Sequence, residues 1–288
     1  MHYKTVKGIL SQRNSMNIYR GCSHGCIYCD SRSLCYQMDH DFEDIEVKEN
    51  AIVLLESKLS SKRKTAMIGT GSMSDPYMHI EKTLKMTRKA LEVIERHGFG
   101  VTILTKSSLI LRDLDLYKKI NAKSKSIIQM TLTTYDEDLC KTLEPNVSTT
   151  KERFETLKVF RDNGIETVVW LDPFLPFIND TFENIKGLMD YCIEAKVKGI
   201  VCFGIGLTLR EGNREYFYKK LDEYFPGFKE KYIKHYGLNY QILSPNNDKL
   251  MNYIRKTSKE HQIMIETDEV FKYLATLPNK RLQLSIFD

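Results

Sequence analysis

Three cysteines fall within eight residues of one another near the N-terminus, in the segment Cys22-Ser-His-Gly-Cys26-Ile-Tyr-Cys29. Thiolates are soft ligands that suit iron–sulfur clusters, zinc and copper. Gly21 and Gly25 supply the backbone freedom that a loop needs to bend around a metal centre. Three thiolates leave one iron of a 4Fe–4S cluster without a protein ligand, and an open position lets a metal site accept a substrate or cofactor.

Two plainer interpretations of these cysteines stay open at this point. Free cysteine is often a core residue, so the three could line one buried helix face, although the two glycines and the position at a strand end disfavour this. A structural zinc site is the other, with a fourth ligand from His24, Asp30 or Cys35. Core packing is our first interpretation of the isolated Cys140, Cys192 and Cys202, whereas Cys35 is ambiguous between ligand and packing residue.

A second candidate site is the turn Gly69-Thr-Gly-Ser-Met-Ser-Asp75. Its glycines and small hydroxyl residues follow a predicted strand and would let a ligand approach the backbone closely, although most such loops are ordinary turns. Asp75 precedes a proline, which keeps it extended, and could alternatively cap the next helix. Lys106 follows the third predicted strand and offers a point charge there, with a solvated loop lysine as the plainer interpretation.

Strand-like and helix-like segments alternate through most of the chain. The predicted strands are Met16–Tyr19, Thr65–Ile68, Gly100–Leu104, Ile127–Leu132, Glu166–Leu171 and Gly199–Phe203. The predicted helices between and after them are Glu49–Leu59, Glu81–Arg96, Leu114–Ile120, Thr150–Asn163, Phe182–Ala195 and Arg214–Tyr224. Gly98, Gly164 and Gly199 stand where a helix ends and a strand begins, as C-cap glycines do.

About six strand–helix units in succession indicate parallel βαβ units with right-handed crossovers. A closed eight-fold barrel would need two more units. We therefore predict an α/β fold, an open partial (β/α)6 TIM-type barrel over residues 1–225, with a helical C-terminal extension over 226–280. The extension holds the predicted helices Phe228–Tyr236, Asp248–Glu260 and Asp268–Leu277. Residues 281–288 are expected to form an exposed tail.

The composition is that of an ordinary globular protein, with 42% hydrophobic and 28% charged residues. Forty-three basic against 38 acidic residues leave a net charge of +5, which permits an anionic partner without demanding one. No apolar run approaches membrane-spanning length and the first residues hold no secretory h-region, so we expect no membrane association. Seven cysteines without an export signal favour a reducing, cytoplasmic location over a disulfide framework.

The spacing Cys-x3-Cys-x2-Cys with an aromatic before the last cysteine resembles the signature of the radical S-adenosylmethionine (SAM) superfamily. Further segments resemble its spore photoproduct lyase-like branch, a branch of DNA repair enzymes. The resemblance runs from about Tyr3 to about Gly206. The segments that carry it are Tyr19–Cys29, Gly71–Tyr77, Thr105–Ser107 with Leu111–Asp113, Glu144–Pro145, and Pro173–Pro176 with Asn179–Asp180.

The resemblance implies two cofactors, a 4Fe–4S cluster and SAM, together with an external one-electron donor. In this superfamily the open iron chelates SAM, and one electron from the cluster yields a 5′-deoxyadenosyl radical that abstracts hydrogen from a substrate. The residues that match cluster ligands are Cys22, Cys26 and Cys29; those that match SAM-binding positions are Tyr28, Gly71, Ser72, Ser74, Lys106 and Thr131, with Thr133 as the register alternative to Thr131. Arg112-Asp113 and Glu144-Pro145 match family motifs without an assigned role, and no catalytic residue is identified.

One departure from the branch concerns the hydrogen donor. Spore photoproduct lyases carry a cysteine two residues before the Ser-Asp pair, and this chain has Ser72 there. A serine O–H bond is too strong for that role. The resemblance therefore implies a relative with a different substrate or a different hydrogen donor.

The C-terminal residues Leu282-Gln-Leu-Ser-Ile-Phe-Asp288 resemble the peptide by which bacterial repair and replication proteins dock on the DNA sliding clamp, here through Gln283–Phe287. The alternative is a last strand or plug that packs on the protein's own core. We expect a radical SAM enzyme that acts on nucleic acid. The alternatives are a radical SAM enzyme that modifies a peptide, tRNA or small metabolite, and a non-catalytic metal-bearing nucleic-acid adaptor.

Overall fold

The computed structural model describes residues 1–278, and an open six-stranded parallel sheet is its centre. The strands are arranged in the order β2-β5-β6-β7-β8-β9, and every neighbouring pair is parallel. Their bounds are β2 Ser15–Met16, β5 Met67–Thr70, β6 Gly100–Thr105, β7 Ser126–Thr131, β8 Glu166–Trp170 and β9 Gly199–Val201. The sheet has the strand number and direction predicted for a partial (β/α)6 barrel.

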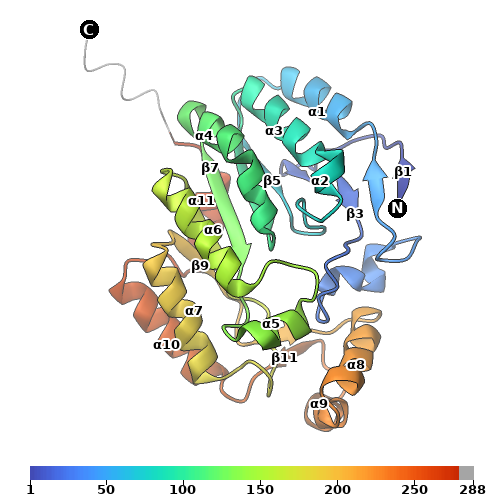
Figure 1. Ribbon diagram of the computed structural model, residues 1–288, viewed down its shortest axis with the longest axis vertical. Coiled ribbons are helices and arrows are strands. Elements are labelled where there is room, and N and C mark those ends of the chain that lie inside the picture. The colour runs from blue at the N-terminus through green and yellow to red at the C-terminus, as the bar shows by residue number, and fades with distance from the viewer. Residues whose placement is uncertain (279–288) are drawn as a thin grey trace.

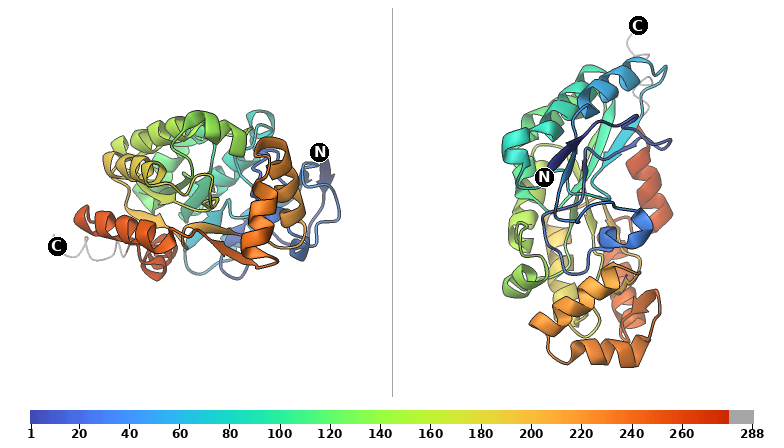
Figure 2. Two further views of the ribbon diagram at one scale, coloured as in Figure 1. Left: turned by 90° about the horizontal axis from the view of Figure 1, so that it is seen from below. Right: turned by 90° about the vertical axis from the view of Figure 1, so that its right-hand side faces the viewer.

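Helices that connect successive strands cover the outer face of this sheet, as Figures 1 and 2 show. They are α1 Ala51–Ser60, α3 Met86–Arg96, α4 Leu114–Lys123, α6 Thr150–Asp162 and α7 Phe182–Glu194. Each lies within three residues of its predicted bounds at either end, except α3, which begins five residues after the predicted start at Glu81. Short helices stand near the carboxyl edge of the sheet, namely α2 Glu81–Leu84, η3 Ser108–Asp113 and α5 Glu137–Leu143.

The predicted helix Glu81–Arg96 is wrong as a single element, because Lys85 has a left-handed φ of 52° and separates α2 from α3. The side chain of Glu81 accepts a hydrogen bond from the backbone N–H of Thr87 (2.8 Å) and thereby satisfies one free donor of the first turn of α3. Arg112 in turn binds the backbone carbonyl of Glu81 at 2.5 Å. These tertiary contacts stabilise a break that helical periodicity does not reveal.

The predicted strand Met16–Tyr19 is also wrong as one element. Met16 pairs with Thr70 in the large sheet, whereas Tyr19 pairs with Val47 in a separate small sheet of order β1-β4-β3. The small sheet consists of β1 His2–Lys4, β4 Glu46–Lys48 and β3 Tyr19–Arg20. It was not predicted, because its strands are two or three residues long and show no usable alternation.

The C-terminal part contains the predicted helices and a strand that was not predicted. Its helices are α8 Asn213–Tyr224, α9 Phe228–Tyr236, α10 Asn247–Glu260 and α11 Thr267–Ala275. The prediction of a purely helical extension is corrected by β11 Gln241–Leu243, which pairs antiparallel with β10 Gly206–Thr208. This pairing joins residues on both sides of residue 225, where the sequence places a domain boundary. The division into two domains stays a prediction.

The helix α11 closes the inner face of the sheet at the end opposite the carboxyl ends of the strands. Met67, Ile127, Val168 and Val201 point inward and pack on Val270 and Leu274 of α11. Their neighbours Ile68, Ile128, Val169 and Ile200 point to the outer helices, as the two-residue period of a strand requires. The inner space is thus filled at one end and available for a site at the other.

Within residues 1–278 no helix is long and apolar enough to cross a membrane. The proposed clamp-binding peptide Gln283–Phe287 lies outside the described residues.

Candidate cofactor and substrate site

The three cysteines lie on a loop that begins two residues after β3. Gly21 has a φ of 82°, and a Cβ there would lie 2.5 Å from the carbonyl oxygen of Phe42, so only glycine fits. The backbone N–H of Cys22 donates to that same oxygen (2.9 Å). Further along the loop, Ile27 donates to the carbonyl of Leu143 (3.0 Å), so two distant segments fix its path.

All three cysteines line one cavity of about 160 Å³ at the carboxyl ends of the strands. Cys22 and Cys26 are buried, and Cys29 is partly exposed. Burial raises the pKa of Cys22 to about 12 and also raises the pKa of Cys26, so both thiols keep their protons until a metal displaces them. The loop is irregular rather than helical, which rules out the interpretation of the cysteines as one buried helix face.

A single zinc ion does not suit the spacing of these sulfur atoms. Thiolates bound to one zinc at about 2.3 Å would lie about 3.8 Å apart in a tetrahedral site. Among the described residues, sets of three ligand atoms within 4.8 Å of one another occur only around His40, and the three cysteines form no such set. A wider spacing fits a polynuclear cluster, in which each sulfur binds a different iron. Cys35 is exposed and lines no part of this cavity.

The turn after β5 forms the facing wall of the cavity. Gly71 has a φ of 101°, and a Cβ there would lie 1.9 Å from the carbonyl oxygen of Leu104, so this residue must be glycine. Ser72 is exposed and Ser74 is buried, and both line the cavity. The turn therefore approaches β6 more closely than any other residue type would allow.

Asp75 joins three segments of the cavity wall. Its carboxylate accepts hydrogen bonds from the Thr105 hydroxyl (2.7 Å), the Lys106 backbone N–H (2.7 Å) and the Tyr77 backbone N–H (2.8 Å). His24, from the cysteine loop, places its Nδ1 3.4 Å from the same carboxylate. Asp75 thus holds the cysteine loop, the glycine turn and the end of β6 together rather than capping a helix.

The structure brings every predicted SAM-binding residue to this cavity. Lys106 and Thr131, at the ends of β6 and β7, line it together with Tyr28. Thr133, the register alternative, is fully buried and lines no part of it. Burial alone would lower the pKa of Lys106, but Cys26 and Glu144 raise it overall, so the ammonium stays charged. SAM binding by these residues stays a prediction.

A buried ionic network of Glu144 and Arg153 holds Tyr28 of the cysteine loop in place. The Tyr28 hydroxyl and the Arg153 guanidinium both donate to the carboxylate of Glu144. Burial raises the pKa of Glu144, but Arg153 and Lys106 lower it overall, so the group is an anion. This network gives Glu144-Pro145 a role that the sequence did not assign, since Tyr28 is both packed beneath the loop and exposed to the cavity.

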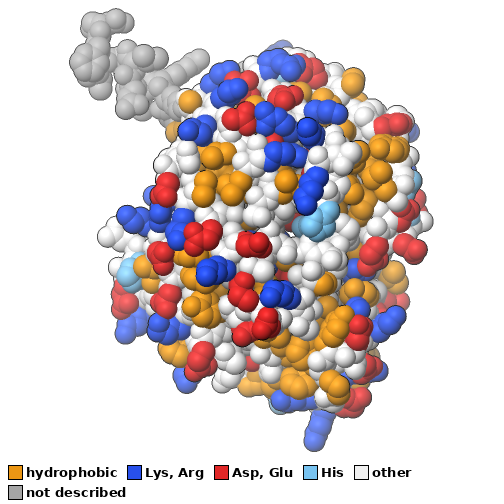
Figure 3. Space-filling view, viewed as in Figure 1, with side chains coloured by type: hydrophobic (Ala, Val, Ile, Leu, Met, Phe, Trp, Pro, Cys, Tyr) orange, Lys and Arg blue, Asp and Glu red, His pale blue; other side chains and the backbone are white. Residues whose placement is uncertain are grey.

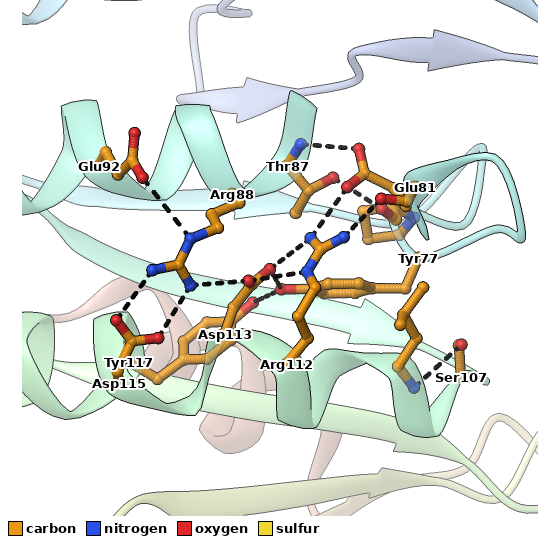
Figure 4. A network of polar contacts seen from close by, with 12 residues as sticks. Tyr77, Glu81, Thr87, Arg88, Glu92, Ser107, Arg112, Asp113, Asp115 and Tyr117 are labelled. Atoms are coloured by element: carbon orange, nitrogen blue, oxygen red, sulfur yellow. Dashed lines mark hydrogen bonds and ion pairs between the residues drawn. The ribbon is translucent and has the colours of Figure 1, made fainter. Parts of the chain in front are cut away.

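Arg112-Asp113 belongs to a second buried network, drawn in Figure 4. Arg112 binds the side chain of Glu81 at 3.0 Å, and Asp113 accepts hydrogen bonds from Tyr77 (2.9 Å) and Arg88 (3.0 Å). None of these side chains lines the cavity of the cysteines. The motif joins α2, α3 and α4 beside the glycine turn and is structural.

A larger cavity of about 480 Å³ opens from the first one. The two share Tyr28, Cys29, Ser31, Ser72, Lys106, Trp170 and Asp172 in their linings. The outer cavity adds the aromatic side chains of Phe203 and Tyr240, which are 52% and 49% exposed. Its volume falls within the usual range for small-molecule sites.

Asp172 and Trp170 are site residues that the sequence analysis missed. Trp170 is the last residue of β8 and pairs with Thr131 of β7, and Asp172 follows two residues later. Burial raises the pKa of Asp172 to about 7, although Lys106 lowers it in part. The rule that ligands bind at the carboxyl ends of parallel strands could have drawn attention to them.

Comparison with known proteins agrees with this geometry. Residues 16–192 match the family model of the radical SAM superfamily, which is more than half of the chain. The chain therefore belongs to the radical SAM superfamily, whose enzymes use a 4Fe–4S cluster and SAM.

Relatives in other organisms and solved structures show what else the chain is similar to. An uncharacterized protein of Methanocaldococcus jannaschii is 34% identical over 167 residues, which cover 57% of this chain and 61% of that relative. An uncharacterized protein of Mycobacterium tuberculosis is 29% identical over 232 residues, covering 78% of this chain and 67% of the relative. A structure of spore photoproduct lyase complexed with dinucleoside spore photoproduct has a TM-score of 0.65 at 13% identity, covering 91% of this chain and 79% of that one. The fold is thus similar to that of spore photoproduct lyase.

Proposed function

We propose that this chain is a radical SAM enzyme that holds its cluster on Cys22, Cys26 and Cys29 and acts on a nucleic-acid substrate. The observation that carries the proposal is the convergence of the cysteine loop, the Gly71 turn and Lys106 on one cavity. The donor set fits the cofactors, because three thiolates leave one iron open and the remaining wall offers backbone, hydroxyl and ammonium groups. When bound, the cluster supplies an electron to SAM and so makes a radical available for hydrogen abstraction.

The residues of this chain bind and orient SAM in this proposal. Lys106 offsets the carboxylate of SAM as a buried charge, and its position is fixed by the bond from its own backbone N–H to Asp75. The glycine at position 71 keeps the wall free of a side chain, so that the amino acid part of SAM can approach the backbone. Tyr28 offers its ring to the adenine, and Thr131 offers a hydroxyl from β7.

The outer cavity supports a substrate with aromatic rings. The half-exposed rings of Phe203 and Tyr240 stand on its wall beside Trp170. Stacking of a nucleobase on such a ring contributes about 1–3 kcal/mol per base. Spore photoproduct lyase, which is similar in fold, has a structure complexed with dinucleoside spore photoproduct. The face shown in Figure 3 mixes basic and acidic side chains, so base stacking in the cavity, rather than a phosphate track on this face, supports the proposal.

The first experiment tests SAM chemistry. The chain is purified and reconstituted with iron and sulfide without oxygen, then incubated with SAM and dithionite. We expect release of 5′-deoxyadenosine, measured by mass spectrometry. A chain that binds no iron, or that binds iron and releases no 5′-deoxyadenosine, would contradict the proposal and favour a non-catalytic adaptor.

The second experiment tests the substrate class. SAM deuterated at C5′ is supplied with damaged DNA, cellular RNA or peptide pools, and deuterium transfer is followed. We expect label exchange with DNA, reduced by Phe203→Ala (52% exposed) and unchanged by Phe182→Ala, a 41% exposed ring on α7 that does not line the cavity. Label that exchanges only with peptide would support the alternative of peptide modification.

Ser72 separates this chain from the spore photoproduct lyases at the hydrogen donor. Because a serine hydroxyl is a poor hydrogen-atom donor, we propose that the product radical takes its hydrogen atom either from another group or from 5′-deoxyadenosine.

The proposed contact with the sliding clamp through Gln283–Phe287 is tested by clamp pulldown with and without residues 283–288. Equal retention of both chains would refute that contact.

A further inference from the structure

Two overlapping groups of potential metal ligands meet at His40, beside the small sheet and outside the cysteine cavity. One group joins His40 to His2 and Asp44, and the other joins it to Asp39 and Glu46. In each group the ligand atoms lie within 4.8 Å of one another. Within residues 1–278 the structure forms these two groups of three and no others.

His40 presents a free nitrogen to this cluster. Its side chain is nine-tenths buried, at 10% exposure, and its Nδ1 lies 2.9 Å from the carbonyl oxygen of Asp41. A carbonyl only accepts hydrogen bonds, so Nδ1 carries the proton and Nε2 keeps its lone pair. Nε2 has no hydrogen-bond partner and faces Oε2 of Glu46 at 4.0 Å. Two electron-rich atoms that face each other at this distance favour a proton or a metal ion between them.

His2 converges on the same carboxylate. It pairs directly with Glu46 in the parallel register of β1 and β4, which brings the two side chains together. Its Nδ1 lies 2.8 Å from Oδ2 of Asp44 and donates to it, which leaves Nε2 3.9 Å from Oε2 of Glu46. A carboxylate that holds the far nitrogen of an imidazole is the usual support of a metal-binding histidine.

Lys4 supplies the neutralising charge near Glu46 while no metal competes for it. Its Nζ lies 2.9 Å from Oε2 of Glu46 and 3.4 Å from Asp39. The Lys4 side chain is 43% exposed, whereas that of Glu46 is 2% exposed. The lysine can therefore leave Glu46 for water at little cost, which gives a cation access to the carboxylate.

We propose that Asp39, His40 and Glu46 bind a divalent transition metal of the zinc class. His2, whose Nε2 lies 3.9 Å from Glu46, is the fourth ligand, and Asp44 orients it. Two imidazoles and two carboxylates give the four nitrogen and oxygen ligands of a tetrahedral zinc site. The ion joins β1, β4 and the segment that precedes β4. Because β3 pairs with β4 and ends two residues before Cys22, the site braces the start of the cysteine loop. This inference does not rest on the proposed function.

The test uses the cluster-loaded chain, so that the cysteines are already occupied. Zinc is titrated by calorimetry without oxygen, and zinc-edge X-ray absorption identifies the ligand atoms. We expect one zinc per chain in addition to the cluster, bound by nitrogen and oxygen without sulfur. His40→Ala and Glu46→Gln are each expected to weaken binding about 10-fold or more. Lys4→Ala is expected to tighten it, since it removes the competing charge.

The matched control is His97→Ala, which removes a partly exposed histidine that also contacts a carboxylate, Glu56, at 2.6 Å. It should leave zinc affinity unchanged. If His40→Ala fails to fold, His2→Ala serves instead, because that side chain is 39% exposed and its loss is tolerated more easily. Absence of zinc binding, sulfur ligands in the absorption spectrum, or equal affinity for the His97→Ala and His2→Ala chains would overturn the proposal.

Discussion

The carboxyl group of Asp172 lines both cavities, and its pKa lies near neutrality. Burial raises its pKa to about 7, from a usual value of about 3.9. Between these values the folded chain holds a proton that the unfolded chain has released. The free energy of unfolding therefore falls as pH rises from about 4 to about 7, and the lost stability is not regained above that.

We predict that Asp172→Asn removes this part of the pH dependence. Its stability relative to the wild-type chain should increase as pH rises from about 4 to about 7. Urea unfolding at several pH values measures the difference. Asp138→Asn is the control, because that side chain is 93% exposed and should follow the wild type. A constant difference between wild type and Asp172→Asn across this range would show that the carboxyl is already charged at low pH.

At the cysteine loop, we predict that Cys22→Ala, Cys26→Ala and Cys29→Ala each abolish assembly of the cluster, because two thiolates do not hold a cubane that needs three. Iron content and the absorption of the reconstituted chain measure this. Cys35→Ser is the matched control, since that exposed cysteine lies six residues after Cys29 and does not line the cavity of the other three. Loss of iron from Cys35→Ser would instead assign Cys35 a ligand role.

Among the elements, the turn after β5 leaves no room for a side chain at Gly71. A Cβ at Gly71 would lie 1.9 Å from the backbone of β6, which cannot move without breaking strand pairs. We predict that Gly71→Ala destabilises the chain by about 2–4 kcal/mol and lowers SAM binding. Gly98→Ala is the control, since its φ of 70° is also positive but nothing lies within 4 Å of a Cβ there. It should cost about 1 kcal/mol and leave SAM binding intact. Equal effects of the two variants would contradict the steric argument.

The sequence predicts elements that bury a periodic face and misses those that depend on a partner. The strands of the large sheet and the helices between them follow from alternation and from C-cap glycines such as Gly98. The strands β1, β3 and β4 do not, because three residues show no period and their pairing joins segments more than 25 residues apart. The same holds for Asp172, since its proximity to Thr131 and Lys106 arises only when β6, β7 and β8 lie side by side.

At the scale of the whole molecule, the inner space of the sheet is arranged in layers. The first layer is apolar and packs under α11 at one end of the sheet. The second layer is a chain of side-chain hydrogen bonds, in which Trp170 donates to Gln129 (2.8 Å) and Gln129 donates to Thr102 (2.7 Å). The cavity of the cysteines lies beyond this chain, with Thr131 and Trp170 in its wall. The C-terminal helix thus forms the floor on which a site at the N-terminal loop depends, which links the two ends of the sequence.

This arrangement predicts that a cavity made under α11 destabilises the whole chain rather than the helix alone. Leu274 is 5% exposed and packs on the inner layer of the sheet, so Leu274→Ala should reduce the free energy of unfolding by about 2–5 kcal/mol. Lys272→Ala, on the exposed side of the same helix, should change it by less than about 0.5 kcal/mol. Cluster absorption and far-ultraviolet circular dichroism, followed together during unfolding, should lose signal in one transition for Leu274→Ala. If circular dichroism instead showed that α11 melts first while the cluster persists, the C-terminal helix would be an independent appendage and not the floor of the site.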